Sequence, residues 1–329
     1  MYDITSIVEM AYKTIQKHKL PEGGFSRWLW QDEKGTRELG INEYGCADAV
    51  NCLYTLGLLP CNSEEREELI KSIQILQNPD TGLFEEATHD KFHTTAHCIA
   101  ALELLDAKPL YPVVGMHDLL DRDRLYEYLE KRDWIKEPVI ASHQAAALYA
   151  ALVISGEADS LWEKWYFDWF WNNTDERTGF WKKGAILDNS DLYRHMVAAF
   201  HYMFNHEYRH VPMKHPDKMI DSGLYLLENH PERYGRQIAF EEMDWTYIMN
   251  RATRQTDYRY KEAKQAIIKF ADYYMPWLLS VDYESNDEFN DLHKLFGTLC
   301  FLAELQSAIP GLIYSPKPLR LVLDRRPFI

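Results

Sequence analysis

Apolar residues recur along the chain at the three- and four-residue spacing of helices, and no long alternating pattern of a strand occurs. Six segments are apolar on nearly every side. They begin near residues 44, 93, 142, 192, 243 and 291, so successive starts lie 49, 49, 50, 51 and 48 residues apart. A spacing this constant over six units is typical of a helical repeat.

Six amphipathic segments with a polar face alternate with the apolar ones, at residues 2–18, 63–77, 122–133, 158–173, 217–230 and 258–280. In the second of them Ser63 is the expected N-cap, and acidic residues fill the first turn. A helix that is apolar all round is buried, whereas one with a polar face lies outside. We therefore predict an all-α fold, an (α/α)6 toroid with six inner and six outer helices, formed by residues 1–329 as a single domain. An open solenoid is the alternative, but the repeats share little residue identity, which favours closure.

Two loops share a motif. "LQNPDTGLFEEATHDKFHTTAHCIAALELLDAKP" and "WNNTDERTGFW" each contain an Asn, a turn with Asp, then Thr-Gly and an aromatic residue. The first resembles the repeat of the protein prenyltransferases and terpene cyclases, most clearly over residues 68–109. The resemblance implies the toroid superfamily but not prenyl chemistry. The DxDD motif of the cyclases is missing, "DAVNC" lacks the DxC spacing of the prenyltransferase zinc set, and the Cys-Cys-His ligation of lanthionine cyclases is not seen.

Polar and titratable residues stand at the start of every predicted inner helix. In a toroid these six starts face one end, where they would form a funnel with a partial positive field. An unpaired buried His or Asp adds nothing to stability, and histidine is not a favoured N-cap. We expect at least three of the following to line one cavity: His93, His97, His143, His195 and His201.

The candidate residues are chosen by their shared position at the starts of the predicted inner helices. Candidate catalytic residues are His93, His97, His143, His195 and Asp244; candidate substrate contacts are Tyr44, Asp48, Asp90, Tyr193, Arg194, His201, Trp245 and His293. Asp244, Tyr247 and Arg251 share one helix face, which fits either an intrahelical salt-bridge ladder or an acid in the cavity. Capping alone explains Ser142, Asn290 and Asp291.

These residue types favour chemistry on a carbohydrate, and the (α/α)6 barrel hosts many such enzymes. A glycoside hydrolase needs two carboxylates across the bond. A polysaccharide lyase needs a His or Tyr base and a cation that neutralises the uronate carboxylate. The 10 Trp and 21 Tyr are apt for stacking on sugars. The alternatives are an isoprenoid enzyme of the terpene cyclase or prenyltransferase type, and a non-catalytic binding toroid.

No cofactor is expected. Zinc is the alternative, because His93 and His97 have the i, i+4 spacing of a metal pair, although no HxH motif occurs.

Composition limits the partners. A formal net charge of −15 argues against nucleic acid, and the only basic cluster, "RLVLDRRPFI", is expected to be a surface anchor. No apolar run of about 18 residues and no signal peptide is seen, so no membrane partner is expected. The five cysteines form no CxxC pair and are expected to be buried. We predict a cytoplasmic protein whose partner is a small molecule or an oligosaccharide.

Overall fold

The computed structural model describes residues 1–189, 191–238 and 240–329. The described residues are predominantly helical, which confirms the all-α prediction. The six predicted apolar helices are α2 Glu43–Thr55, α4 Lys91–Leu104, α6 Pro138–Ser155, α8 Leu192–Arg209, α10 Glu241–Ala252 and α12 Leu292–Ala308. The six predicted amphipathic helices are α1 Thr5–His18, α3 Ser63–Gln74, α5 Arg122–Glu130, α7 Ser160–Asn172, α9 Pro216–Asn229 and α11 Tyr260–Leu278.

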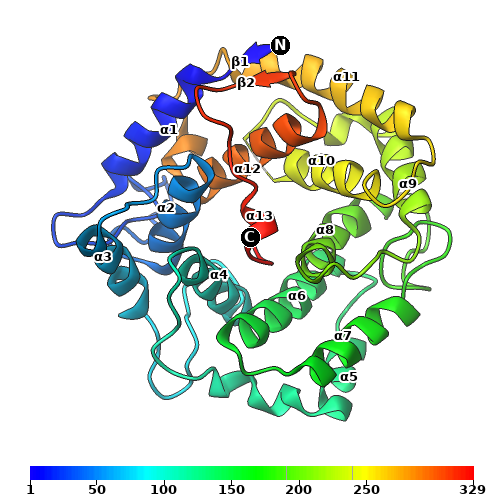
Figure 1. The fold of residues 1–329 in the computed structure, drawn as a ribbon, viewed down its shortest axis with the longest axis horizontal. Coiled ribbons are helices and arrows are strands. Elements are labelled where there is room, and N and C mark those ends of the chain that lie inside the picture. The colour runs from blue at the N-terminus through cyan, green and yellow to red at the C-terminus, as the bar shows by residue number, and fades with distance from the viewer. Residues whose placement is uncertain (190, 239) are drawn as a thin grey trace.

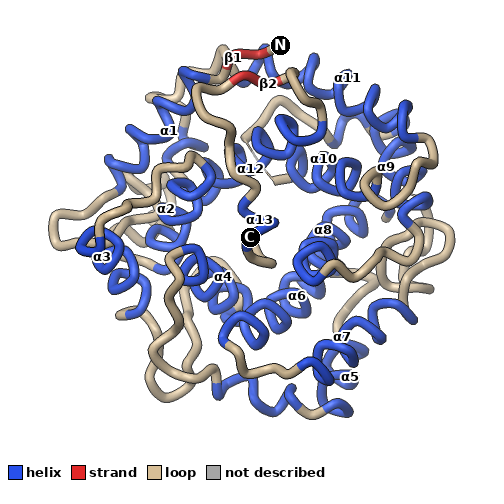
Figure 2. The backbone as a smooth tube through the Cα atoms, viewed as in Figure 1, coloured by secondary structure: helices blue, strands red, loops and turns tan. Residues whose placement is uncertain are grey.

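The remaining elements are short. They are the 3₁₀ helices η1 Val114–Leu120, η2 Pro231–Arg233 and η3 Asp287–Asn290, the helix α13 Val322–Arg325, and the strands β1 Tyr2–Asp3 and β2 Ile313–Tyr314. The two strands pair in parallel, with Tyr2 opposite Ile313. Figure 2 shows this pair at the edge of an otherwise helical fold.

The apolar helices form the inner layer. Each packs against the next in the series, and α12 packs back on α2, so the contacts make a closed cycle. Figure 1 shows α2, α4, α6, α8, α10 and α12 around the centre of the view, with the amphipathic helices outside them. Burial follows the sequence pattern: α10 is buried from Glu242 to Ala252, whereas α3 buries only Leu69, Ser72 and Ile73. We call these two sets the inner and outer helices.

The two loop motifs form the same turn. Asn78 and Asp175 each accept hydrogen bonds from the backbone two and three residues on. Four residues further on, Gly82 and Gly179 have positive φ values of 69° and 76°. A Cβ at Gly82 would lie 1.8 Å from the carbonyl oxygen of Pro112. Glycine is therefore required both by the turn and by the close approach of the segment at Pro112.

Two helix starts differ from the predicted caps. Asn62, not Ser63, caps α3 by accepting from the backbone of Glu65. Ser142 is no cap, because Pro138 occupies the first turn of α6 and starts the helix four residues earlier. Asp291 does cap α12, as expected, but Asn290 does not, because its Oδ1 accepts from the backbone N–H of Leu29.

The string that carries the basic cluster enters the fold, which corrects the expectation of a surface anchor, although Arg320 stays exposed and Arg325 half-buried. Residues 319–329, here called the central segment, run to the middle of the inner layer, where Figure 1 marks the C end. α13 packs on α8 and α2. Arg326 and Phe328 are fully buried, and Arg326 donates to Asn51 Oδ1 over 2.6 Å. The sequence pattern could not show this, because the apolar residues between the arginines fill the space that the inner helices leave.

One described helix, α6, is long and apolar enough to cross a membrane by length and composition alone, and 67% of it is buried in the fold. The expectation that no segment reaches this length is therefore wrong for α6. Ser142, His143 and Gln144 interrupt the apolar run in the sequence, yet they lie within one helix that is rich in Ala and Leu. A core helix of a soluble protein has the same composition.

Candidate functional site

A cavity of about 450 Å³ lies at the starts of the inner helices. Its walls come from α4, α6, α8, α10 and α12. His93, His143 and His201 all line it, which confirms that at least three of the five predicted histidines share one cavity. Asp244 and His293 line it as well. A volume of this size is in the range of small-molecule sites.

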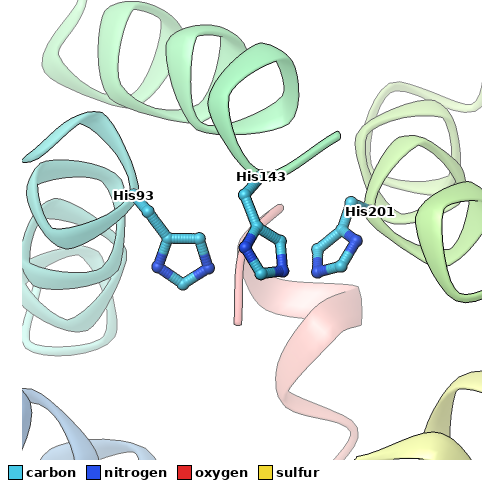
Figure 3. A group of neighbouring side chains, drawn as sticks. All are labelled: His93, His143 and His201. Carbon is cyan, nitrogen blue, oxygen red and sulfur yellow. The ribbon is translucent and has the colours of Figure 1, made fainter. Parts of the chain in front are cut away.

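Three of these histidines form one group. His93, His143 and His201 come from α4, α6 and α8, and Figure 3 shows their rings side by side. The ring centroid of His143 is 4.6 Å from that of His93 and 4.4 Å from that of His201. Burial, and next the repulsion of neighbouring histidines, holds the pKa of His93 and of His143 well below the ordinary value, and burial lowers that of His201 to about 3. All three rings are therefore neutral near pH 7.

A second group surrounds Asp48. His97 Nε2 lies 2.7 Å from one carboxylate oxygen of Asp48, and His293 Nδ1 lies 3.0 Å from the other. Asp48 and His97 are fully buried. Burial alone would raise the pKa of Asp48, but His293 and His97 together hold it below the ordinary value. Asp48 is therefore ionised and accepts from both rings.

Both groups contain side chains that could ligate a metal ion. The sequence paired His93 with His97 for this purpose. The structure separates them: His93 belongs to the three-histidine group and His97 to the Asp48 group. Tyr44 lies between the two groups, since its ring stacks on that of His97 at 4.6 Å and its hydroxyl is 2.5 Å from His93 Nδ1.

The start of α10 brings buried acid to the cavity. Asp244 is 2% exposed, and its Oδ1 has no hydrogen-bond partner among the described residues. Burial, followed by the charges of Glu241 and Glu242, raises the pKa of Asp244 well above its ordinary value. Asp244 is therefore a neutral carboxylic acid near pH 7. Arg251, two turns on, pairs with Glu304 and not with Asp244, so no intrahelical ladder forms.

Cationic groups line the cavity as well. Arg27 donates to both carboxylate oxygens of Asp291, over 2.8 and 2.9 Å, and its guanidinium lies 5.0 Å from the centre of the Tyr44 ring. Lys294 lines the cavity and is 3.6 Å from Glu288. Burial would raise the pKa of Asp291, but the charge of Arg27 holds it below the ordinary value.

Several predicted residues lie away from the cavity. Trp245 points to the outer layer, where its Nε1 donates to Gly223. His195 is held by the backbone carbonyl of Trp181, 2.7 Å from Nδ1. Because His195 and His201 are six residues apart, they face different sides of α8.

The other predicted residues that lie away from the cavity make contacts near the starts of their helices. Asp90 caps α4 by accepting from the backbone of Phe92. Arg194 is exposed and pairs with Glu137. Tyr193 packs against Tyr234. Residues at equivalent positions near the inner-helix starts thus do not all face the cavity. Some of them face the outer helices instead.

The sequence missed several lining residues. His89 is part of the histidine-rich start of α4, but it precedes the helix. Arg27 comes from the loop before α2, whose "GGFSRW" string gave no sign of an ion pair with Asp291, 264 residues away. Ile329 belongs to the central segment, and Phe240 precedes α10. Of these four residues, only His89 could have been predicted from the sequence, because it lies close to His93.

The chain matches no protein-family model, and comparisons with curated proteins and with solved structures find no similar chain. The resemblance of residues 68–109 to the prenyltransferase and terpene cyclase repeat therefore has no support beyond the helical character of the fold. Function rests on the chemistry of the cavity.

Proposed function

We propose that the protein is a carbohydrate-active enzyme of the polysaccharide-lyase type, which cleaves a uronate-containing oligosaccharide in the cavity by β-elimination. The observation that carries the proposal is the pair of Asp48 and His293. A fully buried carboxylate holds the Nδ1 side of an imidazole that lines the cavity. This is the arrangement that fixes a histidine tautomer for proton abstraction.

His293 is the base in this proposal. Because Asp48 is ionised, it accepts the Nδ1 proton of His293, and Nε2 is left as the basic lone pair. Among the described residues Nε2 of His293 has no hydrogen-bond partner. Asp48 also stabilises the imidazolium that forms when Nε2 takes a proton. Asp48 is therefore a positioning residue.

Asp244 is the acid. Its neutral carboxyl group lies at the same cavity and can donate the proton that the leaving oxygen needs. In the reaction, His293 removes the proton beside the uronate carboxylate. A carbon–carbon double bond forms, the bond to the glycosidic oxygen breaks, and Asp244 protonates that oxygen. No water, oxidant or reductant is consumed.

The carboxylates of the cavity favour a lyase over a hydrolase. A hydrolase of the usual kind needs one protonated and one ionised carboxyl group across the bond. Asp291 is tied to Arg27, and the other carboxyl groups of the described lining, Asp244 and Glu241, stand three residues apart on one face of α10 and so not on opposite sides of a bond. Lys294 and Arg27 are placed to attract a substrate carboxylate, and Phe200 and Phe240 offer an apolar wall to a sugar ring.

Three further assignments belong to this proposal. The closed cycle of inner-helix contacts supports the (α/α)6 toroid class. The net charge of −15 supports a partner other than nucleic acid. The five free cysteines, of which four are buried, support a cytoplasmic location. Acid–base elimination needs no ion, but zinc favours imidazole ligands and would add a positive charge at the histidines of the cavity.

The test is an elimination assay on a panel of polyuronates and neutral oligosaccharides, with and without zinc. Elimination yields an unsaturated uronate, which is followed by its ultraviolet absorbance, while reducing ends report total cleavage. We expect cleavage of a uronate substrate with equal yields of both signals. His293→Ala and Asp244→Asn should each lower kcat by about 10²–10⁴-fold.

His195→Gln is the matched control, because His195 is buried at an inner-helix start but lies outside the cavity. It should leave kcat unchanged. Reducing ends without ultraviolet absorbance would identify a hydrolase and overturn the lyase proposal. Turnover of a prenyl diphosphate instead of a sugar would overturn the substrate class.

A further inference from the structure

We propose that His93, His143 and His201 bind one Zn²⁺ ion through their Nε2 atoms, with the open coordination position of the ion facing the cavity. Each ligand comes from a different inner helix, and one ring nitrogen of each histidine lies within 4.8 Å of one ring nitrogen of the other two. Around a tetrahedral ion with bonds of about 2.1 Å, ligand nitrogens are roughly 3.4 Å apart. Small rotations of the three side chains would bring them to that spacing.

The hydrogen bonds of the group leave the required atoms free. Ser142 Oγ is 2.6 Å from the carbonyl oxygen of Val139, so its single proton is donated there. The same oxygen is 3.1 Å from Nδ1 of His201 and can only accept from it. Nδ1 of His201 therefore carries the proton, and Nε2 presents a lone pair.

His93 has an equivalent outer partner. Its Nδ1 faces the hydroxyl of Tyr44 at 2.5 Å, which leaves Nε2 for the ion. His143 is partly exposed, and among the described residues neither of its ring nitrogens has a hydrogen-bond partner. Histidine ligands of zinc commonly donate their second nitrogen to a neighbouring acceptor, which fixes the ring. Tyr44 and Ser142 meet that requirement.

The Asp48 group does not compete for the ion. Its ligand atoms are already bonded to one another, over 2.7 and 3.0 Å, in a buried arrangement. A metal would have to break both hydrogen bonds. The three-histidine group has no such internal bonds among the described residues, and the cavity beside it gives an ion access.

Three protein ligands and one open position are typical of catalytic zinc sites, whereas structural sites use four protein ligands. The open position faces the cavity that His293 and Asp244 line. There the ion would take a carboxylate oxygen of the ligand. This role rests on the proposed elimination, but binding of the ion does not.

The experiment measures metal without substrate. The full chain is stripped with a chelator, dialysed, titrated with Zn²⁺ alone, and analysed for zinc per chain after gel filtration. Co²⁺ in place of zinc reports the coordination through its visible absorption. We expect one zinc per chain, an increase of the thermal midpoint on zinc addition, and a tetrahedral Co²⁺ spectrum.

His143→Ala is the decisive variant, because the side chain is partly exposed and its loss leaves no buried partner. We expect its zinc affinity to fall about 100-fold or more. His201→Gln serves as a second ligand variant. Two controls should bind zinc as the wild type does: His195→Gln, on the same helix as His201, and Asp48→Asn, in the other group.

Wild-type protein that retains no stoichiometric zinc overturns the site. Full binding by His143→Ala together with loss in Asp48→Asn overturns it as well, because the ion would then sit in the Asp48 group. Equal loss in His143→Ala and His195→Gln would show general instability and not ligation. Since no sugar is present, these results are independent of the elimination assay.

Discussion

Glu242, in the first turn of α10, gives a prediction whose size can be worked from the structure. The side chain is 1% exposed, and neither carboxylate oxygen has a hydrogen-bond partner among the described residues. Burial, with smaller contributions from Glu241 and Glu288, raises its pKa from 4.5 to about 8. The folded state therefore holds a proton that the unfolded state releases above pH 4.5.

The sign follows from linkage. Because the native state binds more protons, the free energy of unfolding falls as the pH rises from about 4.5 to about 8. For one group with this shift, the free energy of unfolding is lower than at acid pH by about 1 kcal/mol at pH 5 and by about 3 kcal/mol at pH 7. Glu242→Gln removes the titration. The buried amide adds a cost that does not depend on pH, so the informative quantity is the change of ΔΔG between pH 5 and pH 7.

Urea unfolding followed by circular dichroism at pH 5, 6 and 7 measures this quantity. Relative to wild type, the free energy of unfolding of Glu242→Gln should rise by about 2 kcal/mol between pH 5 and pH 7. For a chain of this length, this corresponds to a rise of roughly 3 °C in the thermal midpoint. Glu64→Gln is the control, since Glu64 holds the same second position of α3 but is exposed. A difference between Glu242→Gln and wild type that is the same at all three pH values would refute the reasoning.

Three other predictions follow from contacts at and near the cavity. Asp48→Asn should lower kcat about 10²–10⁴-fold with little change in KM in the elimination assay, because His293 loses the acceptor that fixes its tautomer. Tyr44→Phe should weaken zinc binding about 10–100-fold in the titration, since His93 loses its outer partner. Gly82→Ala should cost about 2–3 kcal/mol in urea unfolding because of the contact with Pro112, whereas Gly156→Ala, with a φ of 85° and open space around it, should cost about 1 kcal/mol.

Periodicity predicted the helices well, because burial of one face or of all faces is a local property of the sequence. α8 begins at Leu192, as predicted, and the other inner helices begin within a few residues of the predicted starts. The largest difference is at α6, where Pro138 starts the helix ahead of Ser142. The histidines of the cavity were predicted by the same logic, since equal phase on repeated helices places side chains at one end of the fold.

The pairings within the site depend on long-range geometry that no local pattern contains. Asp48 and His293 are 245 residues apart, and Arg27 and Asp291 are 264 apart. Both contacts join the first unit of the chain to the last, and so they exist only because α12 packs on α2. The position of residues 319–329 at the centre was missed for the same reason: a short basic string looks exposed until the space it enters is known.

Cleavage of a uronate oligosaccharide in water labelled with heavy oxygen tests the central claim most directly. The products are analysed by mass spectrometry before the reducing end exchanges with solvent. If His293 and Asp244 carry out an elimination, one product is an unsaturated uronate, and neither product carries the label. Incorporation of one labelled oxygen per bond cleaved would mean hydrolysis, and would contradict the proposed roles of both residues.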